Sequence, residues 1–338
     1  MPTTSIAAAQ ARRRFSLAAM ACAAVATLAA PTAFAQPGGY PSKPVRIIVG
    51  FPAGTGPDIV ARILAQKLSE GWGNQGVVVD NKPGAGGLIA ASEAARAAPD
   101  GYTLMLGETG QLSIAPSSYN KLPYDPAKDF APVSQVVTAD FALLVNPQKV
   151  PARTVKDFVT WTQQQKGLFL ATFGAGTPGH FGAFMFGEAV KLKPEAIHYK
   201  NTTDALGGLF SGDVQGVFAS VGLAAANVKA GKLVALGTTG ATRTPALPDV
   251  PTIKEQGYPS LEFNSWFGIV APAKTPPEIL ARLQADVVKA VQSADGRSKL
   301  EDAGFRVTGT TREEFSKVIA ADTATWGKAV AATGFKAD

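Results

Sequence analysis

The residues best suited to chemistry are glycines and hydroxyls that stand where a predicted strand meets a predicted helix. The first such loop runs Phe51-Pro52-Ala53-Gly54-Thr55-Gly56-Pro57-Asp58. Glycine allows close backbone approach, and the start of a helix offers free N–H groups with a positive partial charge. Gly54, Thr55 and Gly56 therefore form a candidate anion site that needs no lysine or arginine. Asp58 is placed either to cap the helix or to serve as a polar group of the pocket.

A second loop of the same kind runs Gly174-Ala175-Gly176-Thr177-Pro178-Gly179-His180. Gly174, Gly176 and Thr177 offer small residues and a hydroxyl just before a predicted helix, so the loop predicts a second anion site. His180 is one of two histidines in the chain. It is either a structural hydrogen-bonding residue or a contact to the ligand.

Three further features could reach the same region. The glycine-rich run Asn81–Gly87 follows the second predicted strand, and we expect it to turn the chain; support of the pocket is the alternative. Thr109 and Ser220 each follow a predicted strand. Both are candidate ligand contacts, and the alternative is a loop hydroxyl that bonds its own backbone.

The chain lacks the common catalytic patterns. It contains no Gly-x-Ser-x-Gly and no His-Glu-x-x-His, and two histidines cannot form a histidine-rich metal site. We therefore predict no catalysis, no metal and no cofactor. A dinucleotide-binding oxidoreductase is the enzymatic alternative, because Gly54-Thr55-Gly56 follows a strand and Asp80 ends the next one. It is disfavoured because Ile59 replaces the third glycine and Pro57 removes an amide.

Short apolar runs alternate with helical patterns and must position these loops. The runs predict strands at 45–49, 77–79, 102–106, 141–145, 168–171, 196–199, 214–219 and 233–236. The helical patterns include 59–68, 88–97, 155–165, 276–291 and 313–332. This alternation predicts an α/β protein with mostly parallel strands, and ligands of such folds bind outside the carboxyl ends of the strands.

The first 35 residues predict a secretory signal. Arg12-Arg13-Arg14 precede the apolar run 15–30, and Ala33-Phe34-Ala35 is a small-x-small cleavage site. The arginines also fit twin-arginine export, with ordinary Sec export as the alternative. We therefore expect an exported protein of the periplasm, with residues 1–35 removed.

Without the signal, the mature chain carries no cysteine and is only mildly basic. Its 29 basic residues, three fewer than the 32 of the full sequence, face 26 acidic ones, which gives no reason to expect nucleic-acid binding. The 303 remaining residues exceed one usual core, so we expect two domains.

Nine co-linear segments resemble the Bug-type receptors, the extracytoplasmic solute receptors of tripartite tricarboxylate transporters. One is the run Asn81-Lys82-Pro83-Gly84-Ala85-Gly86-Gly87. In chain order the segments are Tyr40–Pro44, Val45–Gly54, Asn81–Gly87, Ala98–Leu104, Leu122–Pro126, Asp129–Val133, Lys229–Leu233, Ala246–Thr252 and Ser265–Gly268. So many matches in order are far more specific than a single motif.

The resemblance implies a two-lobed type II periplasmic-binding-protein fold with a hinged interdomain cleft. We expect lobe 1 to comprise residues 40–137 plus 265–338, and lobe 2 to comprise 138–264, with strands crossing between them. In proteins that this chain resembles, backbone amides after the first strand grip a carboxylate, which maps here to Gly54, Thr55, Gly56 and Asp58. The loop from Gly174 to His180 would face them.

The chain also departs from the family pattern. Thr55 replaces a second adjacent glycine, and Gln215 and Ala219-Ser220 stand where the family often has acids. Missing acids near the cleft disfavour a ligand with an amino group. We expect the aromatic run Phe181, Phe184 and Phe186 to lie in the core rather than in the pocket.

The expected function is capture of a small organic acid for the membrane components of a tripartite tricarboxylate transporter. Two facing amide sites favour a ligand with two carboxylates, aliphatic or aromatic. A membrane sensor kinase is the alternative partner. We expect a monomer that closes around its ligand.

Overall fold

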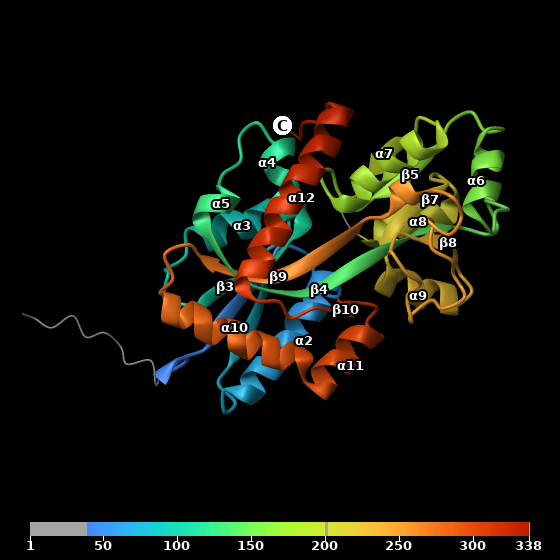
Figure 1. The fold of residues 1–338 in the computed structure, drawn as a ribbon. Coiled ribbons are helices and arrows are strands. Elements are labelled where there is room, and N and C mark those ends of the chain that lie inside the picture. Colours follow the sequence, from blue (N-terminus) through green and yellow to red (C-terminus); the bar gives the residue numbers. More distant parts are fainter. Residues whose placement is uncertain (1–38, 200–201, 338) are drawn as a thin grey trace, which may run out of the picture. The chain divides into compact units, whose positions relative to one another are not determined.

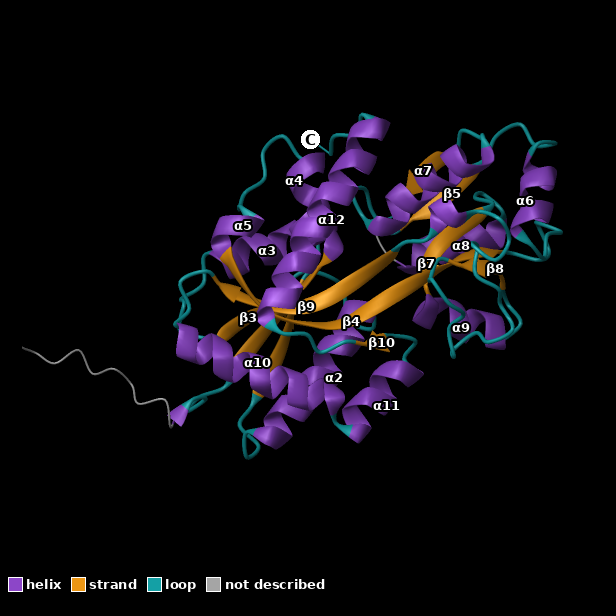
Figure 2. Ribbon diagram, in the orientation of Figure 1, coloured by secondary structure: helices purple, strands orange, loops and turns teal. Residues whose placement is uncertain are grey.

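Residues 41–338 contain a mixed β-sheet covered by helices, and the computed structural model describes residues 39–199 and 202–337 (Figures 1 and 2). The predicted signal peptide lies outside these residues. The strands are β1 (Val45–Val49), β2 (Val77–Asn81), β3 (Thr103–Glu108), β4 (Phe130–Val145), β5 (Phe169–Thr172), β6 (Glu195–His198), β7 (Gly216–Ser220), β8 (Val234–Thr238), β9 (Asn264–Pro272) and β10 (Arg306–Val307). Their order is β2-β1-β3-β9-β4-β7-β5-β6, with β8 and β10 also paired to β4.

Strand β4 connects two groups of strands. Its residues from Phe130 to Asp140 pair with β9, whereas those from Phe141 to Val145 pair with β7 and β8. All of these pairings are antiparallel. Because the period of a strand is two, Leu143 faces one apolar cluster and Leu144 faces another on the opposite side of the sheet.

The α-helices cover the sheet on both faces. They are α2 (Gly56–Gly71), α3 (Leu88–Ala95), α4 (Ala115–Ser118), α5 (Pro126–Asp129), α6 (Val155–Thr162), α7 (Pro178–Val190), α8 (Thr202–Ser211), α9 (Val221–Lys229), α10 (Pro277–Gln292), α11 (Ala294–Asp302) and α12 (Arg312–Thr333). Shorter turns are the 3₁₀ segments η2 (Ala85–Gly87) and η4 (Pro259–Leu261) and the π segment η3 (Gly110–Ile114).

Local sequence explains several helix boundaries. Thr154 and Asp157 form a capping box at the start of α6, and Thr311 and Glu314 form another at the start of α12. Each box satisfies backbone N–H groups that a first helical turn leaves unpaired. Helix α12 ends at Gly334, which adopts the left-handed conformation that favours glycine there.

The core of the described residues includes the following three buried clusters. One joins β1, β3, β9, α3 and α12 through side chains that include Ile48, Trp266 and Phe315. A second lies between the sheet and helices α6 and α7, and a third lies beneath α8 and α9. Phe181 and Phe186 are fully buried in the second cluster, as the sequence predicts.

The predicted strands and helices are present, with two corrections. The sheet is mixed rather than mostly parallel, because β4 and β9 run antiparallel to their neighbours through its centre. The strand predicted at 141–145 begins eleven residues earlier, at Phe130, and continues through buried polar residues such as Ser134 and Gln135. Strand β9, which includes residues 264 and 265, was predicted only as a crossing segment.

Candidate functional site

A cavity of about 660 Å³ opens where the loops after β1 and β5 meet the ends of β3, β7 and β9. Residues from α8, α9 and the end of α11 complete its wall. Five phenylalanines contribute: Phe51, Phe141, Phe173, Phe267 and Phe305. Among the residues that the structure describes, 39–199 and 202–337, the lining of this cavity includes no lysine, arginine or histidine. An anion in this cavity would therefore depend on backbone dipoles and neutral side chains.

The loop before α2 is held in place by its own side chains. Gly54 has a φ of +79° and donates its N–H to the carboxylate of Asp58 at 2.8 Å. The hydroxyl of Thr55 donates to the carbonyl of Pro52 at 2.6 Å. The amide of Asn81 donates both to the Phe51 carbonyl and to the Asp58 carboxylate, at 2.9 and 3.0 Å. The conformation of the loop is thus fixed without a ligand.

Asp58 is the centre of this arrangement. Its side chain is nearly fully buried, and Arg62 donates to it at 2.9 Å. Burial raises the pKa of the carboxyl group, but hydrogen bonds from Arg62, the Gly54 N–H and Asn81 outweigh burial and leave the pKa below its ordinary value. Asp58 therefore stays ionised, and it does not line the cavity. We call Asp58 the latch of this loop, because its carboxylate accepts the Gly54 N–H and so holds the loop from behind.

The loop before α7 repeats this construction. Gly176 has a φ of +76° and donates its N–H to Nδ1 of His180 at 3.1 Å. The hydroxyl of Thr177 donates to the carbonyl of Gly174 at 2.8 Å. In both loops a left-handed glycine donates to a side chain four residues ahead, and a threonine at the N-cap bonds three residues back.

His180 serves the second loop as Asp58 serves the first. It is 1 % exposed and is surrounded by the rings of Phe181, Phe184, His198 and Phe335. Burial, with a smaller contribution from His198, lowers the pKa of His180 to about 4. The neutral ring can accept the glycine N–H at Nδ1, which a protonated ring could not do.

These latches change the role of the predicted glycines. The N–H groups of Gly54 and Gly176, which sequence reasoning offered to a ligand, are already bonded to Asp58 and His180. The amides of Gly56 and Gly179, in the first turns of α2 and α7, have no acceptor among the described residues, and both glycines line the cavity. Gly179 is missing from the set of sites predicted from sequence, although it belongs to the predicted loop.

The two predicted strand-end hydroxyls lie in different places. Ser220 closes β7, makes no side-chain capping bond to α9 and lines the cavity. Thr109 is fully buried, and its hydroxyl oxygen accepts hydrogen bonds from the Ser265 hydroxyl and the Trp266 N–H at 3.2 and 3.0 Å. It anchors β9 to the end of β3 and is not part of the cavity wall.

The structure thus brings Gly54, Thr55, Gly56, Thr177 and Ser220 to the cavity wall. Asp58, Gly174, Gly176 and His180 support that wall from behind, and Thr109 lies outside it. The run Asn81–Gly87, predicted to turn the chain, also supports the site: a Cβ on Gly86 would lie 3.6 Å from the Ala175 carbonyl oxygen.

Glu108 is the residue that sequence reasoning missed. It is the last residue of β3, it is 7 % exposed, and it lines the cavity. Its Oε1 atom is buried without a hydrogen-bond partner among the described residues, and burial raises the pKa of the carboxyl group to about 8. The sequence indicates only its position, an acid beside Thr109 at the carboxyl end of a predicted strand. The missing hydrogen-bond partner of Oε1 is visible only in the structure.

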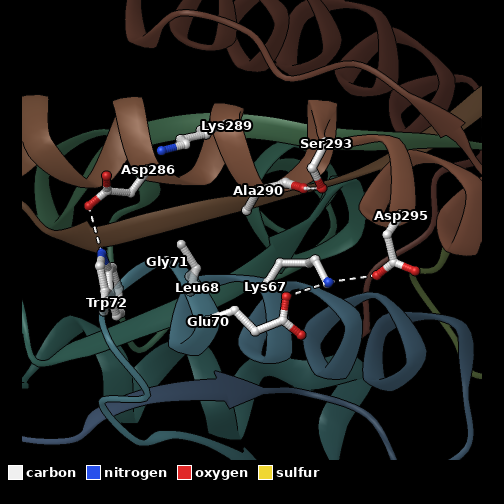
Figure 3. Close-up of a pocket in the computed structure, with 10 residues that line it drawn as sticks. All are labelled: Lys67, Leu68, Glu70, Gly71, Trp72, Asp286, Lys289, Ala290, Ser293 and Asp295. Atoms are coloured by element: carbon white, nitrogen blue, oxygen red, sulfur yellow. Dashed lines mark hydrogen bonds and ion pairs between the residues drawn. The ribbon is translucent and has the colours of Figure 1, made fainter.

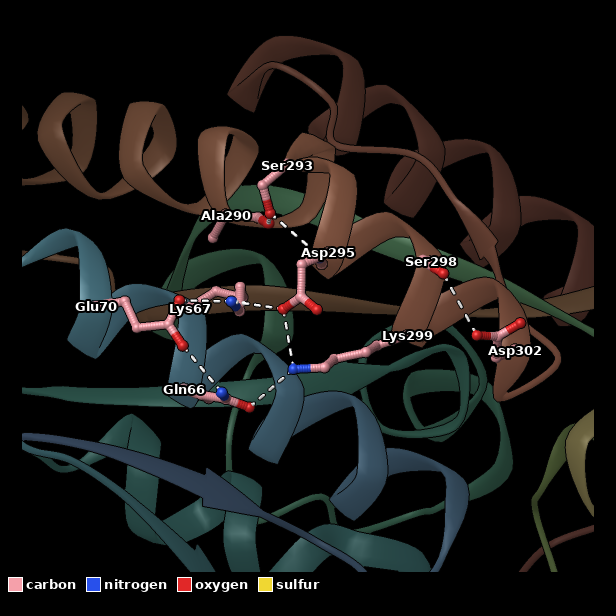
Figure 4. Close-up of polar contacts among 10 residues, drawn as sticks. Gln66, Lys67, Glu70, Ala290, Ser293, Asp295, Ser298, Lys299 and Asp302 are labelled. Carbon is pink, nitrogen blue, oxygen red and sulfur yellow. Dashed lines mark hydrogen bonds and ion pairs between the residues drawn. The ribbon is translucent and has the colours of Figure 1, made fainter.

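A second, smaller hollow of about 180 Å³ lies between α2 and α10 (Figure 3). Trp72 donates to Asp286 at 2.7 Å there, and Lys67 pairs with both Glu70 and Asp295. Figure 4 shows that this network continues to Lys299 on α11. These ion pairs join α2 to α11, whose last residues line the larger cavity.

In 39–199 and 202–337, no group of three or more His, Cys, Asp or Glu side chains is placed to hold a metal ion. No helix in the same part of the chain has the length and apolar character needed to cross a membrane.

Comparison with known proteins relates this architecture to one family. Residues 60–335 match the model of the tripartite tricarboxylate transporter family receptor. Protein BugT from Bordetella pertussis is 31 % identical over 303 residues, which cover 88 % of this chain and 91 % of BugT. These matches confirm the resemblance to Bug-type receptors.

Solved structures agree with the sequence relatives. MatC from Rhodopseudomonas palustris with bound malate is 30 % identical, has a TM-score of 0.79, and covers 86 % of this chain and 100 % of its own. A second R. palustris protein, with adipate, is 32 % identical, has a TM-score of 0.83, and covers 88 % of this chain and 99 % of its own. The predicted α/β periplasmic-binding-protein fold is confirmed. The chain belongs to the family of tripartite tricarboxylate transporter receptors, which are solute receptors rather than enzymes.

Proposed function

We propose that this protein captures a small dicarboxylate in the periplasm and presents it to the membrane components of a tripartite tricarboxylate transporter. The observation that carries the proposal is the pair of similarly built loops on one cavity wall. Each ends at a helix N-terminus with an unused amide, on Gly56 in α2 and on Gly179 in α7.

Two such sites suit a ligand with an anionic group at each end. A helix N-terminus attracts a carboxylate through its partial positive charge and free N–H groups. A monocarboxylate would leave one set of donors to water, which is weaker than a direct match. The malate and adipate named for the two R. palustris relatives are both dicarboxylates, which supports this ligand class.

The middle of the cavity favours an apolar spacer between the carboxylates. Five phenylalanines line the wall, so an aromatic diacid is as compatible as an aliphatic one. The cavity of about 660 Å³ holds roughly 20 waters at about 30 Å³ each, more than a small diacid displaces. Bound water or closure of the cavity must therefore fill the remainder.

We also propose that the chain forms two lobes, residues 40–137 with 265–338 and residues 138–264, which close on the ligand. The change of partners along β4 at Phe141 supports this division, as does the passage of β9 through residues 264 and 265. The monomeric state, the signal peptide and a sensor kinase as alternative partner stay predictions from the sequence.

A thermal-shift screen of organic acids, amino acids and sugars tests the ligand class. A ligand at about 100 times its Kd should stabilise the protein by about 2.7 kcal/mol. We expect C4 to C8 dicarboxylates to raise the midpoint more than monocarboxylates of matched length. A set of hits made up of sugars or cationic amino acids would refute the proposal. Titration calorimetry on the best diacid would then give affinity and stoichiometry.

A further inference from the structure

Glu108 is the feature of the cavity that the paired loops do not explain. Its carboxyl group stands at the end of β3 on the cavity wall, with 7 % of the residue exposed. Its Oε1 atom is buried, and no described side chain or backbone group donates to it. A buried polar atom without a partner costs about 1–3 kcal/mol, so such an atom calls for an explanation.

The surrounding chain is shaped around this carboxyl group. The Glu108 N–H donates to Oε1 of Gln111 at 3.1 Å, and the Tyr124 hydroxyl donates to the Gln111 carbonyl at 2.8 Å. A Cβ on Gly110 would lie 2.8 Å from Oε1 of Glu108, so Gly110 leaves the space that the carboxyl group occupies. Neighbours that could have donated to it are thus bonded elsewhere.

We propose that Glu108 is a ligand-binding residue that, in its neutral form, donates its hydroxyl hydrogen to an oxygen of the bound acid. The inference rests on the proposed function, because it assigns a further hydrogen-bond donor to the ligand beside the two helix N-termini. An ionised Glu108 would repel a dicarboxylate, and no described residue of the cavity wall carries a cationic side chain that would offset this repulsion. A neutral carboxyl group presents a hydrogen-bond donor at the same place.

The electrostatics of the site agree with this geometry. Burial alone raises the pKa of Glu108 to about 8, so the acid is mostly protonated at neutral pH. Nearby titratable groups are Tyr124, whose pKa is raised by burial, Asp302 on the cavity wall, and His180 behind the second loop. Tyr124 and His180 stay neutral between pH 7 and 8. Neither therefore adds a charge that would change the pKa of Glu108, and neither takes up its proton.

Two substitutions separate a hydrogen-bond donor from a charge. Glu108→Gln keeps a donor of nearly the same shape but cannot ionise, whereas Glu108→Leu removes the donor. Glu188→Gln is the matched control, because it makes the same exchange at an exposed carboxylate that does not line the cavity. Circular dichroism and thermal melts would establish that each variant is folded, and Glu108→Gln alone suffices if Glu108→Leu is not.

Calorimetric titration of the purified protein with succinate, malate and adipate between pH 6.5 and 9.5 gives the decisive readout. We expect wild-type affinity to fall above pH 8 by up to about tenfold per pH unit, since binding then takes up one proton. Glu108→Gln should bind within a few-fold of wild type at pH 7, with a flat profile. Glu108→Leu should bind about tenfold or more weakly throughout, and Glu188→Gln should follow the wild-type profile.

Three results would overturn the inference. If wild type and both Glu108 variants bind the diacids with equal affinities and equal pH profiles, Glu108 has a structural role and does not contact the ligand. Selective loss of an ammonium-bearing ligand in Glu108→Gln would instead assign an ionised carboxylate. Failure of the wild type to bind any of the acids would refute the proposed function together with the role of Glu108. The first two results would refute only the role of Glu108, because the wild type would still bind diacids.

Discussion

The unliganded protein should become more stable when Glu108 is replaced by glutamine. The ordinary pKa of 4.5 in the unfolded chain rises to about 8 in the folded protein, so the folded state holds a proton that the unfolded state releases between these values. Stability is therefore complete below pH 4.5 and decreases as the pH rises towards 8. At pH 7 the difference of about 2.5 pH units corresponds to about 3 kcal/mol, at 1.36 kcal/mol per unit.

Glutamine removes this pH-dependent penalty while it retains the shape of the side chain. Its amide remains as poorly partnered as the neutral acid, so that cost largely cancels in the comparison. We expect the melting temperature of Glu108→Gln to exceed that of wild type by roughly 6 °C at pH 7 and by little at pH 4.5. Circular-dichroism melts at half-unit pH steps would measure the difference.

The dependence on pH is the part that can refute the reasoning. A difference between variant and wild type that stays constant from pH 4.5 to 8 would mean that Glu108 does not change its ionisation on folding. A variant less stable than wild type at pH 7.5 would mean that the carboxylate has a favourable partner. Asp302→Asn, exposed on the same wall, should show no growing difference.

Substitutions at three other positions probe the paired loops. Gly56→Pro removes the N–H of a residue that lines the cavity, and it should weaken diacid binding about tenfold in calorimetric titrations. Gly56→Ala keeps the N–H and should weaken binding less. An equal loss of affinity in both variants would mean that the added side-chain volume, and not the lost N–H, causes the effect. Asp58→Asn removes the charge that holds the Gly54 N–H, and it should lower stability by about 1–2 kcal/mol in denaturant titrations and reduce affinity; unchanged affinity would contradict a latch. His180→Asn keeps an acceptor for the Gly176 N–H but does not titrate. Because the folded pKa of His180 is depressed to about 4 from 6.5, wild type should lose up to about 3 kcal/mol as the pH falls between these values, and the variant should lack this component in acid-side melts. Parallel acid profiles would refute the assignment.

Much of the fold follows from apolar periodicity. Val45–Val49 and Val214–Ala219 are apolar runs interrupted only by Arg46 and Gln215, and both coincide with strands that are mostly buried. The first half of β4 was not predicted, because Pro132, Ser134 and Gln135 interrupt the apolar pattern. Those residues are held by neighbours distant in sequence, such as Thr310, which accepts from the Ser134 hydroxyl through its carbonyl and receives the Gln135 N–H on its hydroxyl oxygen.

The sequence predicts where the site lies better than it predicts what each of its residues does. Glycine-rich loops before helices identify two segments of the cavity wall from local sequence alone. Which amides remain free depends on Asp58 and His180, because each lies one helical turn ahead and accepts the glycine N–H. Glu108 could not be recognised from its own segment, since its missing partners become apparent only when β9 and the second loop surround it.

The paired latches divide recognition between main chain and side chains. A backbone donor is erased by a change to proline and by few other point substitutions, whereas any wall side chain can be exchanged freely. In this protein the two ends of the proposed ligand contact peptide groups that are oriented before the ligand arrives. Substitution of wall residues such as Phe141, Phe173 and Glu108 can therefore change which diacids fit the cavity. The proposed hydrogen bonds from the backbone to the terminal carboxylates would stay the same.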